Sequence, residues 1–143
     1  MADEPQTMRA AGRLQSFVHA VAGLGFLVRN EPNMRIHLGL GALAIVAGTW
    51  LHIDPTEWRW IVLAIALVLT AEALNTAVEQ ACNAITREHN PAIKAAKDVA
   101  AGAVLIAATA AAMIGASVFA PHFLPNKASP HYPLFTAMCG ENQ

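Results

Sequence analysis

Residues 71–83 read AEALNTAVEQACN and form the inner half of an apolar run that begins near Trp58. At about 100° per residue, five polar side chains of this segment fall on one stripe of a helix. They are Glu72, Asn75, Thr76, Glu79 and Asn83. A carboxylate within hydrocarbon costs about 3 kcal/mol on insertion scales, so two acids on one face indicate a buried working site. The alternative is a polar seam between helices, for which Asn and Thr alone would be enough.

The rest of the chain has the composition of a small membrane protein. Of its 143 residues, 55% are hydrophobic and 13% are charged, and the mean hydropathy is +0.41. A helix needs about 20 apolar residues to cross a bilayer. Three runs approach or exceed this length, at Met34–Leu51, Trp58–Ala84 and Val99–Ala120. We therefore predict an all-α integral membrane protein with three transmembrane helices.

The basic residues predict which side of the protein faces the cytoplasm. Seven of the nine Lys and Arg residues lie before or at the start of the first run, or between the second and third runs. The positive-inside rule then places the N-terminus and residues 84–98 in the cytoplasm and the C-terminal tail outside it. The expected location is a bacterial cytoplasmic membrane. Because no basic run is interleaved with aromatic residues, nucleic acid is not an expected partner.

The segments outside the three runs define the expected domain boundaries. Residues 1–15 are expected to be a loose leader. From Ser16 to Asn30, apolar residues recur at spacings of three and four, with Ser16 as a candidate N-cap. This predicts an amphipathic helix that lies along the cytoplasmic interface or docks on the bundle. The membrane domain proper is then 16–120, and the proline-rich residues 121–143 are expected to be an extended tail outside the chemistry.

The polar residues near the predicted cytoplasmic boundary lie at different depths. Seven residues at about 1.5 Å each put Glu72 about 10 Å deeper than Glu79, too far for both to bind one small ion. Glu31 and Glu79 lie at a water-accessible level and suit a Mg²⁺ ion that keeps waters and phosphate oxygens as ligands. Glu72 lies where the hydroxyl of a lipid would arrive, and it suits a general base.

Some of the charged residues at the span boundaries also have simpler interpretations. Glu31, Arg35 and His37 crowd the start of the first span, where charged side chains are most often solvated or snorkelling. Asp98 would complement the N-terminus of the third transmembrane helix. Lys97 would bind phosphate as a point charge.

Metal-binding acids, a phosphate-binding lysine and a deep base together favour phosphoryl transfer from a nucleotide to a membrane alcohol. The chain has no GxxxxGK[ST] motif, which excludes a P-loop. The rival function is a small transporter, because paired intramembrane acids also serve proton relays. A transport pathway needs polar groups at both ends, however, and here they cluster at one boundary.

Three segments resemble a known family. EALNTAVEQACNAI at 72–85 and KAAKDVAAGAVL at 94–105 are similar to the small prokaryotic diacylglycerol kinases, which include the undecaprenol kinases. FVHAVAGLGFLVRNEPNMRIHL at 17–38 is similar to the N-terminal part of the same family. The resemblance runs from about Phe17 to Phe119. It implies a homotrimer of three-span subunits, each with an N-terminal surface helix, that uses MgATP to phosphorylate a lipid hydroxyl.

The resemblance also implies roles for individual residues in the chemistry. Glu72 corresponds to the catalytic base, and Asn75 corresponds to its partner in the active-site motif. Glu31 and Glu79 correspond to the acids that bind Mg²⁺ and, through it, ATP. Arg35 and Glu72 are the residues expected to contact the lipid substrate.

Six further positions correspond to nucleotide contacts, namely His19, Glu88, His89, Asn90, Lys97 and Asp98. The chain departs from the family at three places. The family usually has Asp at position 83, a Tyr-His pair at 89–90 and Tyr at position 19, so these departures bear on nucleotide affinity and selectivity. The sequence NMRIHL at 33–38 is more similar to the undecaprenol-type branch of the family, but the choice between undecaprenol and diacylglycerol as the substrate stays open.

Overall fold

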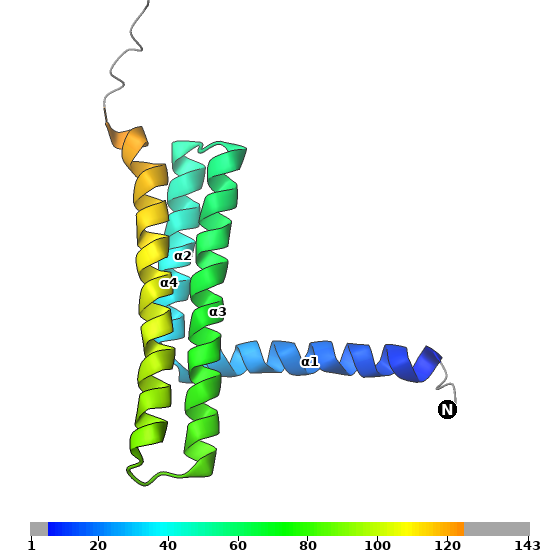
Figure 1. Cartoon of the computed structure of the whole chain (residues 1–143). Helices are drawn as coiled ribbons and strands as arrows, with labels where there is room; N and C mark the ends of the chain where they lie inside the picture. Colours follow the sequence, from blue (N-terminus) through cyan, green and yellow to red (C-terminus); the bar gives the residue numbers. More distant parts are fainter. Residues whose placement is uncertain (1–5, 125–143) are drawn as a thin grey trace, which may run out of the picture.

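The computed structural model describes residues 6–124, which form four α-helices. These are α1 (Gln6–Asn30), α2 (Pro32–Leu51), α3 (Pro55–Ile85) and α4 (Pro91–Phe123). Helices α2, α3 and α4 lie side by side as a bundle, and α1 projects to one side, across the bundle axis (Figure 1). Each of the three bundle helices is long and apolar enough to cross a membrane. The predicted all-α class and the three predicted spans are confirmed.

Proline begins each of the three bundle helices. Pro32, Pro55 and Pro91 occupy first-turn positions, where the missing N–H would have had no helical partner in any case. Because the proline ring disfavours the helical conformation in the residue before it, a preceding helix must end at that residue. The chain therefore specifies by local sequence where each bundle helix starts.

The turn between α2 and α3 is tightly specified. His52 adopts the left-handed conformation, with φ of 54°, and ends α2. Asp54 then caps α3: its carboxylate accepts hydrogen bonds from the N–H groups of Thr56 (2.6 Å) and Glu57 (3.0 Å). Glu57 Oε2 accepts a hydrogen bond from the Asp54 N–H at 2.8 Å, which completes a capping box. The backbone bonds from Glu57 and Thr56 hold the pKa of Asp54 below its ordinary value.

The apolar core lies at this same end of the bundle. It is formed by Ile53, Ile61 and Val118, which are buried together. Gly48 lets the helices approach there, because a Cβ at this position would stand 2.9 Å from Ile53 Cδ1 and 3.0 Å from the Trp58 ring. Most other large apolar side chains of the bundle face outward, as expected for helices that contact lipid or other subunits.

Helices α3 and α4 are longer than a bilayer requires. At 31 and 33 residues, they extend about 46 to 50 Å, whereas the hydrocarbon core is about 30 Å thick. Helix α4 begins at Pro91, eight residues before the predicted third span, so Lys97 and Asp98 lie within it. The residues around the α3–α4 loop can therefore extend beyond the hydrocarbon on rigid helices.

Two predicted boundaries are wrong. Helix α1 begins at Gln6 and not at Ser16, so Ser16 lies inside the helix and is not its N-cap. The segment Met8–Ala11 consists of strong helix formers, which explains why residues 6–15 are helical and not a loose leader. At the other end, α4 continues to Phe123, past the predicted limit at residue 120. The remainder of the predicted tail, 125–143, lies outside the described residues.

Candidate active site at the α3–α4 end of the bundle

The polar stripe of α3 is buried at its deeper end. Glu72 is 1% exposed, Thr76 is 2% exposed and Asn75 is 8% exposed. Glu79 is half-buried and Asn83 is exposed, so burial decreases along α3 towards the α3–α4 loop. The depth order inferred from the sequence, with Glu72 more enclosed than Glu79, agrees with this gradient.

Three buried atoms of the stripe have no hydrogen-bond partner within the described part of the chain. They are Glu72 Oε2, Asn75 Oδ1 and Thr76 Oγ1. An unpaired buried polar group costs about 1–3 kcal/mol, so folded proteins rarely leave one without a ligand or solvent to satisfy it. A structural seam within this one chain would pair these groups with each other. The unpaired atoms therefore favour a site that receives polar groups from outside the chain.

Asn75 and Glu79 contact each other along α3. The Asn75 Nδ2 donates to Glu79 Oε1 at 3.4 Å, a long bond that turns the amide towards the half-buried acid. Asn75 thus connects the deep part of the stripe, at Glu72, to the shallower part, at Glu79. The resemblance made Asn75 the partner of Glu72, whereas the hydrogen bond that the structure shows is to Glu79.

Residues of α2 complete the surroundings of Glu72. Asn33 and His37 on α2, and Glu31 at its N-cap position, lie close enough to interact with the Glu72 carboxylate. Glu31 and His37 are half-buried, so neither is simply solvated. Asn33 and His37 were not among the predicted site residues. Their spacing of four residues, which puts both on one face of α2, was the available signal.

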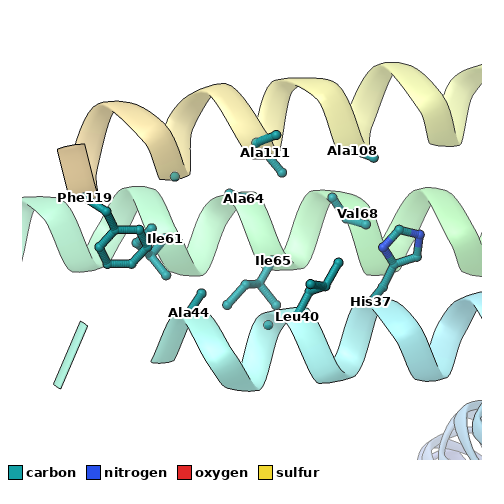
Figure 2. A pocket seen from close by; sticks show the side chains of 13 residues that line it. His37, Leu40, Ala44, Ile61, Ala64, Ile65, Val68, Ala108, Ala111 and Phe119 are labelled. Carbon is teal, nitrogen blue, oxygen red and sulfur yellow. The ribbon is translucent and has the colours of Figure 1, made fainter. Parts of the chain in front are cut away.

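An apolar cavity of about 310 Å³ lies between α2, α3 and α4. Figure 2 shows Phe119 at one end of this cavity and His37 at the other, with Leu40 and Ile65 between them. On the α4 side the cavity is lined by small residues, which leave space between the helices: Ala108, Ala111, Ala112 and Gly115. Val68, which lines it, lies one helical turn before Glu72 on α3.

Lys97 reaches from α4 to the end of the polar stripe on α3. Its Nζ donates to Asn83 Oδ1 at 2.7 Å. Asp98, the next residue, is instead paired with Lys94 on the same helix, and both of those side chains are largely exposed. The structure therefore brings Lys97 to the stripe, whereas Asp98 faces an exposed neighbour on α4.

Several predicted nucleotide contacts lie apart from the stripe or are already engaged. His19 is exposed on α1, which projects away from the bundle (Figure 1). In the α3–α4 loop, Glu88 and His89 are exposed. The Asn90 Oδ1 caps α4, accepting hydrogen bonds from the N–H groups of Ala92 (2.9 Å) and Ile93 (3.4 Å). Only the Nδ2 group of Asn90 is thus left for a ligand.

Arg35, predicted to contact the lipid, does not face Glu72. It is exposed on α2 and lies about 200° around the helix from Asn33, which is near Glu72. Within one chain, the structure gathers Glu31, Glu72, Asn75 and Glu79, and it leaves Arg35 on another face of α2.

Glu31 and Glu79, the two shallower acids, are better suited to bind a magnesium ion that keeps other ligands than to form a metal site closed by protein side chains. Within residues 6–124, no three His, Cys, Asp or Glu side chains are grouped to hold a metal. The charges of Glu31 and Glu79 both repel that of Glu72, and the Glu31 side chain makes no capping hydrogen bond to α2. Two carboxylates suit Mg²⁺, which keeps waters and takes phosphate oxygens as its other ligands.

Comparisons with known proteins define the class of enzyme. The chain is 38% identical over 107 residues to the undecaprenol kinase of Bacillus subtilis (strain 168), covering 75% of this chain and 87% of that one. It is 36% identical over 116 residues to the diacylglycerol kinase of Synechocystis sp., and 32% over 81 residues to that of Escherichia coli (strain K12). These matches cover 80% and 57% of this chain, and 66% of each diacylglycerol kinase. With its three apolar helices, the chain is a multi-pass membrane lipid kinase.

The family follows from a match over most of the chain. Residues 18–119 match the prokaryotic diacylglycerol kinase family. The chain belongs to the prokaryotic diacylglycerol kinase family, and the matched range includes every predicted site residue from His19 to Asp98. The resemblance stated from the sequence is confirmed.

Proposed function

We propose that the protein transfers the γ-phosphate of MgATP to the hydroxyl of a membrane lipid alcohol, undecaprenol or diacylglycerol. The observation that carries this proposal is the position of Glu72. Its carboxylate is buried, its Oε2 has no hydrogen-bond partner among the described residues, and Val68, which lines an apolar cavity, lies one helical turn away. An apolar chain in the cavity would bring the lipid hydroxyl to a proton acceptor where water is scarce.

The proposed reaction divides the work by depth along α3. Glu72 accepts the proton of the lipid hydroxyl as the lipid oxygen bonds to the γ-phosphorus and the bond from that phosphorus to the β-bridging oxygen breaks. Asn75 holds Glu79 and offers to the reacting groups its Oδ1, which has no partner in the described part of the chain. Glu31 and Glu79 would hold Mg²⁺, which neutralises charge on the phosphate oxygens. Lys97 binds the phosphates from α4.

The other nucleotide contacts remain part of the proposal. His19, Glu88, His89, the Nδ2 group of Asn90, and Asp98 are assigned to ATP by the family resemblance. Arg35 is assigned to the lipid on the same basis. Since His19 and Arg35 lie away from Glu72 within one chain, a homotrimer is the proposed assembly in which to test them.

We propose a bacterial cytoplasmic membrane as the location, with the N-terminus and the α3–α4 loop on the cytoplasmic side. The support is the positive-inside rule: Arg87, Lys94 and Lys97 lie around that loop, and only Arg59 lies near the α2–α3 turn within the described residues. The apolar side chains Phe17 and Leu24 are exposed on α1, which supports its placement along the membrane interface.

The rival transporter has little support. A pathway needs polar groups through the whole bundle, but the α2–α3 end is filled by Ile53, Ile61 and Val118. The deciding experiment gives the purified protein labelled MgATP in mixed micelles with undecaprenol or with diacylglycerol. Transfer of label to one alcohol is expected. Ion flux in liposomes without transfer to either alcohol would overturn the proposal.

A further inference from the structure

The contact between Lys97 and Asn83 joins the two longest helices near their loop. The residues are 14 positions apart in the chain, and Lys97 Nζ lies 2.7 Å from Asn83 Oδ1. On α3, Asn83 lies about 20° around the helix from Glu72 and one turn beyond Glu79, so it continues the polar stripe. Asn83 lies about 6 Å along α3 from Glu79, a proposed metal ligand, and the bond fixes the ammonium group of Lys97 at this end of the stripe.

The chemistry of the partner matters as much as its position. An ammonium group has three donors, and Asn83 takes one, which leaves two for a ligand. An amide carries no charge, so Lys97 keeps its full positive charge. The ion pairs formed within the described part of the chain do not include Lys97, and the neighbouring Asp98 is paired with Lys94.

An anionic partner would change this balance. A carboxylate at position 83 would also hold Lys97, but it would offset the charge of the ammonium group. The Asn of this chain separates the two effects: it positions the lysine without neutralising it. The group best recognised by such a fixed, unneutralised cation is a phosphate of the nucleotide.

We infer that Asn83 is a positioning residue for the kinase reaction, which holds the Lys97 ammonium over the polar stripe for the phosphates of MgATP. The inference rests on the proposed function. Asn83 does not itself touch the reacting atoms. Its effect is on nucleotide binding, and the lipid alcohol should be bound as before.

A double-mutant cycle tests this inference. In the full-length protein in mixed micelles, Asn83→Ala is expected to raise the KM for MgATP roughly tenfold, with little change in kcat or in the KM for the lipid alcohol. Lys97→Met should raise the same KM by at least as much. The double variant should be no worse than Lys97→Met alone, because the two residues act as one unit. Ala is a better helix former than Asn, so the exposed site should still fold.

Asn83→Asp separates position from charge. It keeps the acceptor, so the KM for MgATP should rise less than in Asn83→Ala. The salt dependence of MgATP binding should become weaker than in the parent, because the Asp-Lys pair is neutral overall. The matched control is Gln80→Ala, on an exposed position of the same helix, which should leave all constants unchanged.

The outcomes distinguish this inference from the proposed function. A parent protein that transfers no phosphate to either alcohol contradicts the proposed function itself. An active parent whose Asn83→Ala variant has an unchanged KM for MgATP overturns the inference alone. Additive effects of Asn83→Ala and Lys97→Met would overturn it too, because Asn83 would then act independently of Lys97.

Discussion

At the α2–α3 end of the bundle the polar groups are paired, whereas at the α3–α4 end several buried ones are not. Asp54 and Glu57 form a reciprocal capping box, and Glu57 also lies 3.6 Å from His122 Nε2 on α4. Just inside them, Ile53 and Ile61 are buried in an apolar core. The local sequence rules and the tertiary packing agree at this end, which is the property of a region built for stability.

The α3–α4 end of the bundle does not follow the rule that buried polar groups are paired. Glu72 and Thr76 are almost fully buried, yet each has an unpaired oxygen within the described residues. Lys97 is held by one bond to Asn83. Proteins tolerate such costs at functional sites and offset them elsewhere. The comparison therefore predicts that substitutions at the α3–α4 end change activity more than stability, and that those at the α2–α3 end do the reverse.

The largest expected effect is on catalysis, at Glu72. Glu72→Gln keeps the size of the side chain but removes the proton acceptor, so kcat should fall by ~10²- to 10⁴-fold while MgATP still binds. Because the amide is neutral, the cost of burying a carboxylate disappears, and the variant should melt at the same temperature as the parent or higher. Nucleotide titrations and melting curves measure the two quantities separately.

Glu79→Gln is the matched comparison, since the same change is made seven residues along the same helix. Loss of a metal ligand should weaken the binding of MgATP, with partial recovery at raised Mg²⁺. If Glu72→Gln loses MgATP binding as badly as Glu79→Gln, or if it unfolds, Glu72 is a metal ligand or a structural group. The division of labour by depth would then be wrong.

The largest effect on stability is expected at Gly48. In Gly48→Ala the new Cβ would stand 2.9 Å from Ile53 Cδ1, and the overpacking should destabilise the fold by about 1–3 kcal/mol. Gly39→Ala is the control, because nothing lies within 4 Å of a Cβ there. Thermal unfolding in detergent measures both. Protein that remains folded should keep its kcat, and a selective loss of kcat in Gly48→Ala would break the separation between the two ends.

A smaller effect is expected from truncation of the C-terminal segment. The sequence predicted that residues 121–143 form an extended tail outside the chemistry, but His122 lies within α4 and contacts Glu57. Removal of residues 125–143 should leave stability and activity unchanged. Removal from Pro121 onwards should lower stability by about 0.2–1 kcal/mol through loss of the His122–Glu57 contact, with turnover retained. Lost turnover in either truncated protein would show that this segment takes part in the chemistry.

The features that the sequence predicted are those that depend on local pattern. The three apolar runs predicted the bundle helices without knowledge of how they pack. The prolines at 32, 55 and 91, which begin those helices, were a local signal that the prediction did not use. The polar stripe follows from helical period alone, and Glu72 and Thr76 share the buried face as expected. The leader was misjudged because its polar composition was given more weight than the helix propensity of its residues.

The features that the sequence did not predict depend on how each helix is rotated against its neighbours. His37 faces Glu72 because of the angle at which α2 packs on α3, and Lys97 meets Asn83 because α4 approaches α3 closely near the loop. Small residues set these approaches, and their positions do not reveal which polar side chains will meet. The sequence likewise did not show that Asp98 would pair with Lys94 and not with Lys97, its neighbour in the chain.

The smallest expected effect concerns pH and the capping box. The backbone bonds from Glu57 and Thr56 lower the pKa of Asp54, so the unfolded chain takes up a proton at this site before the folded chain does. The stabilisation is therefore fully present above the ordinary value of 3.8, and it is lost as the pH falls through the lower folded-state value. Asp54→Asn keeps a side-chain oxygen that can cap α3 but does not titrate, so its melting temperature should fall less steeply with acid than that of the parent. Melting curves collected from neutral pH to below 3.8 compare the two slopes. Because Glu72 lies in the buried stripe and not in this turn, the same substitution should leave the pH profile of kcat unchanged. A shift of that profile in Asp54→Asn would mean that the two ends of the bundle are coupled and that the structural end also governs the chemistry.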